Sequence, residues 1–103
     1  MYGISRRSGP RKDLRLSSQI TSAVVSVMSN LAEGFERKGR GEKLHLYNVA
    51  RGSSAEVRSL LYVIQDNYEE LSEDAVALQA QAVRVGKLVT GLIRSTKSRF
   101  PKP

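Results

Sequence analysis

Proline occurs only near the two ends of this 103-residue chain, at Pro10, Pro101 and Pro103. Proline has no amide hydrogen to donate and its ring clashes with the preceding turn, so it interrupts helices more than any other residue. The stretch 11–100 contains no proline and can therefore form long helices without interruption. Whether it does so depends on the spacing of its apolar residues.

Apolar residues recur every three or four positions in three successive runs, which is the spacing of one helix face. We predict helices over about 13–34, 42–69 and 72–97. Residues 34–41 hold three glycines and three cations and should form a loop. The three faces are marked by Leu16, Ile20, Ala23, Val24, Val27 and Leu31, then by Leu44, Tyr47, Ala50, Arg51, Ser54, Val57, Leu61, Ile64 and Tyr68, and last by Leu78, Ala82, Val85, Val89, Leu92 and Ile93.

The fold class that follows is all-α, an antiparallel helical bundle with three long helices and short loops. The bundle should occupy residues 13–100, after a basic and flexible N-terminal segment at 1–12 and before a short tail at 101–103. The second helix is nearly apolar all round at residues 60–64, a pattern that requires burial on more than one side. We therefore expect either that another chain covers the second side, so that the protein is an oligomer, or that a further helix completes the bundle.

The chain is strongly basic, with 17 Lys and Arg against 10 Asp and Glu and a net charge of +7. Residues 1–43 carry nine basic and four acidic residues, 44–71 two and four, and 72–103 six and two, so both flanks are basic. A basic surface favours partners that carry phosphate or carboxylate, such as nucleic acid. A solvated surface that binds nothing specific explains the same counts, and both interpretations stay open.

Two groups of cations are candidate nucleic-acid contacts, because a phosphate contact needs only a reachable cation. One group falls in and just after the predicted loop, and the other lies on one face of the third helix. They are Arg37, Lys38, Arg40 and Lys43 in the first group and Arg84, Lys87 and Arg94 in the second. Few aromatic residues are present to stack on bases. We therefore favour recognition of structured RNA or DNA over recognition of single strands, and RNA is the favoured partner.

Two polar pairs could meet across a helix interface. Asn30 and Glu33 lie three residues apart in the first helix, and Ser53 and Glu56 lie three apart in the second. We expect a buried hydrogen-bonded lock that fixes the register of the two helices, because a buried carboxylate needs partners. A catalytic carboxylate pair is the alternative, but it would need a pocket and usually a metal or nucleophile. We assign no catalytic residue.

Enzyme and cofactor chemistry find no support in the sequence. Glu42 and His45 form one Glu-x-x-His unit, which carboxylate di-metal bundles use twice, and His45 is the only histidine. The chain has no cysteine, no phosphate-binding loop and no dinucleotide-binding glycine pattern. We expect no metal, no cofactor and no enzymatic activity. With no membrane-spanning run and no secretory signal, we also expect a cytoplasmic protein without membrane association.

A longer pattern resembles a known family. It comprises Ser29-Asn30-Leu31-Ala32-Glu33-Gly34-Phe35-Glu36-Arg37, then Leu46-Tyr47, Ala50-Arg51-Gly52-Ser53-Ser54-Ala55-Glu56-Val57 and Leu60-Leu61. From about Leu16 to Ile93 the chain is similar to the four-helix-bundle family of 23S rRNA intervening-sequence proteins, which includes the accessory variability determinant of diversity-generating retroelements. The resemblance implies a non-enzymatic, basic, oligomeric helical protein, pentameric in the retroelement branch, that binds nucleic acid and a reverse transcriptase.

The resemblance also implies a helix that is missing here. Family members usually begin with an additional helix, and residues 1–12 are too short, too basic and too glycine-rich to form it. We then expect a neighbouring subunit to cover the groove that this helix would fill, unless the protein is a degenerate copy.

Two functions stay open for a chain of this kind. The first is a protein that binds structured nucleic acid as an oligomer, either as accessory to a retroelement reverse transcriptase or as an rRNA intervening-sequence protein. The second is a structural module that docks on a protein partner and binds no nucleic acid.

Overall fold

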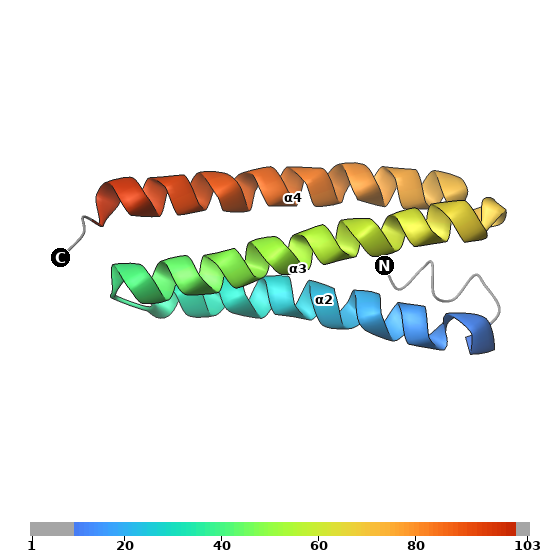
Figure 1. Ribbon diagram of the computed structural model, residues 1–103, viewed down its shortest axis with the longest axis horizontal. Helices are drawn as coiled ribbons and strands as arrows, with labels where there is room; N and C mark the ends of the chain where they lie inside the picture. Colours follow the sequence, from blue (N-terminus) through green and yellow to red (C-terminus); the bar gives the residue numbers. More distant parts are fainter. Residues whose placement is uncertain (1–9, 101–103) are drawn as a thin grey trace.

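The computed structural model describes residues 10–100, with side chains from Arg15 onward. Three long helices account for most of this part: α2 (Pro10–Glu36), α3 (Arg40–Asn67) and α4 (Ser72–Arg99). A 3₁₀ turn, η1 (Glu69–Leu71), joins α3 to α4. Successive helices run in opposite directions (Figure 1), which confirms the predicted all-α bundle of three long helices. The expected tail at 101–103 and most of the expected flexible segment at 1–12 lie outside the described residues.

The first helix and the first loop differ from the sequence prediction. α2 begins at Pro10, a residue whose fixed φ suits the first turn of a helix. The loop predicted over 34–41 shortens to residues 37–39, because Gly34 stays helical. A Cβ at Gly34 would overlap the ring of Tyr47, lying 2.8 Å from Cδ1. Glycine at this position therefore serves the close approach of α2 and α3.

α3 is the central helix of the molecule. α2 and α4 each pack along α3, and within the described residues they make few contacts with each other (Figure 1). The molecule is a rod of 52 × 21 × 15 Å. Its Cα radius of gyration is 15.7 Å, larger than the value of about 13 Å for a compact chain of this length. The three helices form an open layer with one side uncovered between α2 and α4.

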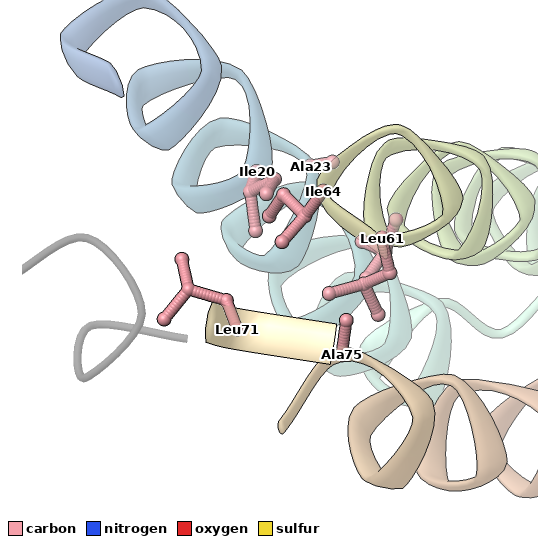
Figure 2. Close-up of a cluster of buried hydrophobic side chains, with 7 residues drawn as sticks. Ile20, Ala23, Leu61, Ile64, Leu71 and Ala75 are labelled. Carbon is pink, nitrogen blue, oxygen red and sulfur yellow. The ribbon is translucent and has the colours of Figure 1, made fainter. Parts of the chain in front are cut away.

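Two clusters of buried side chains hold the helices together. Near the turn from α3 to α4, Figure 2 shows Ala75 pointing toward Leu61 of α3, with Ile64 beside Ile20 of α2. This first cluster consists of Ile20, Ala23, Val57, Leu61, Ile64, Leu71 and Ala75. The second cluster lies in the first half of α3 and the second half of α4, and it consists of Tyr47, Ala50, Val89 and Ile93. The face that the sequence predicts for α3 supplies buried residues to both clusters.

The face that the sequence predicts for α4 is only partly covered. Val89 and Ile93 are buried, whereas Leu78 and Ala82 are half-buried and Val85 is exposed. These last three residues border an open space of 340 Å³ between α2 and α4, which we call the α2/α4 channel. Its lining consists of Val24, Val27, Met28, Leu31, Ser54, Val57, Leu78, Gln81, Ala82 and Val85. No charged residue is among them.

Candidate nucleic-acid interface

Four cations surround a groove of 540 Å³ between α3 and α4, which we call the α3/α4 groove. Arg51 and Arg58 come from α3, and Lys87 and Arg94 come from α4. All four side chains are exposed at the surface. Among the described residues, no acidic side chain lines the groove, so none of them neutralises the positive charge inside it. An anion that enters would meet cations on both walls.

The cations share the groove because of helical spacing. Residues seven apart lie on the same face of a helix, about 10.5 Å along its axis, and each helix contributes one such pair. The groove is open because small side chains lie between the pairs. Ala55 and Ala82 are part of its lining, together with Gly86 and Gly91. A Cβ at Gly91 would meet nothing within 4 Å, so the glycine leaves free space there.

The structure brings together two of the cations that the sequence singled out. Lys87 and Arg94 line the α3/α4 groove, while Arg84 is exposed on α4 outside its lining. Sequence reasoning missed Arg51 and Arg58 as candidates. The sequence pattern predicts Arg51 as part of the packed face of the second helix, whereas the structure leaves its side chain exposed. The seven-residue repeat of basic residues in the second and third helices was the signal that could have found the complete set.

The predicted loop cations have different surroundings from one another. Lys38 is exposed. Arg37 is also exposed, and its Nε lies 3.6 Å from Oε2 of Glu42. Arg40 begins α3 and is half-buried, and its Nε atom is buried without a hydrogen-bond partner in the described structure. Arg37 and Lys38 are therefore the accessible pair at this end of the rod.

The structure corrects the prediction that Lys43 contacts phosphate, because its amine is hydrogen-bonded inside the protein. The residue is only 8% exposed. Its Nζ donates hydrogen bonds to the carbonyl oxygens of Gly34 at 3.0 Å and Phe35 at 3.3 Å, in the last turn of α2. The same atom lies 5.3 Å from the centre of the Phe100 ring. A cation stabilises the carbonyl end of a helix, so Lys43 acts as a cap of α2 and is poorly placed to contact phosphate.

The predicted polar lock is also corrected, because both of its carboxylates are exposed. Glu33 and Glu56 face solvent, while Asn30 and Ser53 are half-buried. The bond between helices joins the hydroxyls of Ser26 and Ser53 at 2.7 Å. The Asn30 amide donates to the Ser26 carbonyl oxygen at 2.8 Å within α2. Short hydroxyl side chains fit this contact without the desolvation cost that a carboxylate would carry.

The remaining ionisable groups include the exposed His45 and the buried Tyr47. His45 is exposed, and within residues 15–100 no three His, Cys, Asp or Glu side chains gather as metal ligands. Burial raises the pKa of the Tyr47 phenol above its ordinary value of 10.0.

None of the helices in the described part of the chain is long and apolar enough to cross a bilayer.

Comparison with known proteins supplies the family. The family model for the 23S rRNA-intervening sequence protein matches residues 1–91. The chain belongs to this family. Neither a curated protein nor a solved structure matches it. The match spans α2, α3 and most of α4, and it includes the α2/α4 channel and the groove cations up to Lys87.

Proposed function

We propose that this member of the 23S rRNA-intervening sequence family binds structured RNA by gripping its phosphate backbone in the α3/α4 groove. The observation that carries the proposal is the pairing of two cations from α3 with two from α4 around an open space, with no acidic side chain among the lining residues that the structure describes. The family name supplies the link to ribosomal RNA.

The lining of the groove favours backbone recognition over the reading of bases. Within the described part of the chain it contains no aromatic residue on which an unpaired base could stack, and single-strand binding relies on such stacking. Arg and Lys side chains lie on opposite walls of the groove. They can contact phosphates on both sides of an RNA strand that belongs to a helical stem and enters the groove. The groove therefore suits a structured RNA recognised by shape and charge.

The proposal includes self-association of the chain, as the family resemblance implies. Several copies would present several grooves to one RNA, which raises apparent affinity without any new contact. In the retroelement branch of the resemblance, the RNA would be the template of a reverse transcriptase, and that enzyme would be the protein partner.

The test is a gel-shift titration of an rRNA hairpin at several salt concentrations. We expect log affinity to fall steeply with log salt, because each phosphate contact releases condensed counterions. Reversing Arg58 and Lys87 together to glutamate should lower affinity at least about tenfold and flatten that dependence. Both side chains are exposed, so the variant should keep its helical circular-dichroism spectrum.

The matched control reverses a cation on α4 outside the groove. Arg84→Glu changes the net charge by the same amount as one groove reversal and leaves the lining intact. It should weaken binding less than Lys87→Glu does. Equal losses in the two single variants would show that the general surface charge, and not the groove, holds the RNA.

A protein-docking module is the second candidate function. Tyr62 and Val63 favour it, because they are 50% and 44% exposed on the outer side of α3. Docking would be supported in place of RNA binding if the chain failed to bind the hairpin even at low salt and still bound a protein partner through these residues. Tyr62→Ser with Val63→Ser should then abolish this binding.

A further inference from the structure

One neutral hydroxyl lies between the two α4 cations of the α3/α4 groove. Thr90 follows Lys87 by three residues and precedes Arg94 by four, so all three residues lie on one face of α4. At a rise of about 1.5 Å per residue, Thr90 is about 4.5 Å along the helix axis from Lys87 and about 6 Å from Arg94. All three residues line the groove. The hydroxyl therefore belongs to the same surface as the cations.

The Thr90 hydroxyl is free to bind a ligand. Within the part of the chain that the structure describes, it makes no hydrogen bond with the protein, and its oxygen reaches solvent although the residue is half-buried. Thr96, on the same helix, shows the alternative, because its hydroxyl donates to the Leu92 carbonyl oxygen at 2.8 Å. Thr90 keeps its donor and its acceptor lone pairs for a partner in the groove.

The other hydroxyl of the groove lining is already engaged. Ser54 is 4% exposed, and its Oγ donates to the Ala82 carbonyl oxygen at 3.5 Å. The remaining lining residues that the structure describes are the four cations and glycine, alanine and valine. Thr90 is therefore the neutral side chain of this lining that can hydrogen-bond a ligand.

Glycines near Thr90 let a ligand approach it closely. Gly86 and Gly91 both line the groove, and a Cβ at Gly91 would meet nothing within 4 Å. Because glycine has no side chain, it allows the backbone of a ligand to come near the helix. A nucleic-acid strand in the groove can therefore lie beside the Thr90 oxygen while the longer cationic side chains reach its phosphates.

The two α4 cations span a short stretch of one nucleic-acid strand. Lys87 and Arg94 lie about 10.5 Å apart along the helix axis, and each strand of a duplex carries one phosphate about every 3.4 Å along the duplex axis. Phosphates held at the two residues would therefore be about three nucleotides apart. Sugars lie between the phosphates of a strand, so Thr90 would face a sugar.

The sugar is the place where RNA and DNA differ in hydrogen bonding. The 2′-hydroxyl of ribose is both a donor and an acceptor, and DNA has a hydrogen atom in its place. Lys and Arg side chains bind the phosphates of either nucleic acid through charge. A threonine hydroxyl can donate or accept, so it can pair with a 2′-hydroxyl while the cations hold the neighbouring phosphates.

We propose that Thr90 hydrogen-bonds a ribose 2′-hydroxyl of the strand held by Lys87 and Arg94, and so makes the α3/α4 groove select RNA over DNA. The proposal rests on the proposed function and deepens it by naming the chemical group that the groove recognises. The four cations supply affinity for any phosphate backbone, and Thr90 supplies the preference for ribose. One hydrogen bond of this kind changes affinity about three- to tenfold.

The experiment compares two hairpins of one sequence that differ at the sugar. One has ribose throughout, and the other has 2′-fluoro sugars, which keep the A-form helix and lack the hydroxyl. In gel shifts we expect the wild type to bind the ribose hairpin about three- to tenfold more tightly. Thr90→Val removes the hydroxyl and keeps the branched shape, so it should lose affinity for the ribose hairpin alone and bind both equally. Its salt dependence should match that of the wild type, because no charge changes.

Two control variants separate the hydroxyl from other effects of substitution. Thr90→Ser keeps a hydroxyl at the same position and should retain most of the preference for ribose. Thr21→Val makes the matched substitution at a half-buried threonine of α2 outside the groove lining, and it should leave the preference unchanged. All three variants should keep the helical circular-dichroism spectrum of the wild type.

The outcomes distinguish this role of Thr90 from the proposed function. Equal binding of the two hairpins by the wild type, an unchanged preference in Thr90→Val, or an equal loss in Thr21→Val would overturn the role of Thr90. If reversal of Arg58 and Lys87 still abolished binding, the grip on phosphate would stand without it. A wild type that bound neither hairpin at low salt would overturn both proposals.

Discussion

Gly34 shows how one missing side chain sets the distance between two helices. A Cβ here would overlap the Tyr47 ring, which is 1% exposed and belongs to the second core cluster. We predict that Gly34→Ala lowers the free energy of unfolding by about 1 to 3 kcal/mol, because the ring cannot move without disturbing its neighbours.

The control is another helical glycine, Gly52, where a Cβ would meet nothing within 4 Å. Gly52→Ala should raise the free energy of unfolding by about 0.5 to 1 kcal/mol through helix propensity alone. Urea denaturation of both variants measures the difference. Equal effects at the two positions would mean that the contact with Tyr47 has no energetic weight.

Lys43 has a structural role that its charge did not reveal. Because its amine bonds the carbonyl oxygens of Gly34 and Phe35, Lys43→Met should leave these groups without their charged donor. We predict a loss of about 1 to 3 kcal/mol of stability by thermal denaturation. RNA affinity at a temperature where the variant is folded should change less than in Lys87→Glu.

Tyr47 predicts how stability depends on pH at the alkaline end. Its pKa in the folded protein lies above 10.0 because burial disfavours the phenolate, so the folded state keeps this proton to higher pH than the unfolded state. The resulting stabilisation is complete below the unfolded pKa and is lost as the pH rises through the folded pKa. Urea denaturation between about pH 8 and 11 should show this loss, and Tyr47→Phe should reduce it. Parallel profiles for the two proteins would contradict the prediction.

At the scale of elements, the turn between α2 and α3 separates two kinds of cation. Arg37 and Lys38 are accessible, whereas Arg40 and Lys43 are held partly or fully inside. We predict that Arg37→Glu with Lys38→Glu weakens hairpin RNA binding and leaves the thermal midpoint within about 2 °C. Adding Arg40→Glu should lower that midpoint further, since its side chain is half-buried. Unchanged RNA affinity in the first variant would confine binding to the α3/α4 groove.

At the scale of the whole molecule, α4 divides two surfaces of opposite character. One side faces the cationic α3/α4 groove and the other faces the uncharged channel. If RNA is held on the groove side alone, Met28→Glu on the channel side should lower RNA affinity less than Lys87→Glu does. Its log affinity should fall with log salt as steeply as that of the wild type, because no phosphate contact is lost. A loss as large as that of Lys87→Glu would show that the RNA also contacts the channel side.

The polar contact between α2 and α3 shows where sequence reasoning stopped. Spacing alone placed Asn30, Glu33, Ser53 and Glu56 near the helix interface, but it could not tell which of them face inward. The rotation of each helix about its axis decides this, and it is set by the packing of Ile20, Ala23 and Val57 in the core. The result places the Ser26–Ser53 hydrogen bond partly inside the interface and leaves both carboxylates in water.

The sequence by itself determined that the chain is a bundle of three long helices, because helical periodicity and the absence of internal proline are local properties. It also identified the family, since the motif from Ser29 to Arg37 and the one from Ala50 to Val57 are contiguous in the chain. Only the tertiary structure decided which cations lie together. Arg58 and Lys87 share a groove because α3 and α4 run antiparallel at a fixed register. Lys43 is buried because the first turn of α3 packs against the last turn of α2. The seven-residue spacing within each helix is a local property, but the register between helices that brings the cations together depends on contacts between residues distant in sequence.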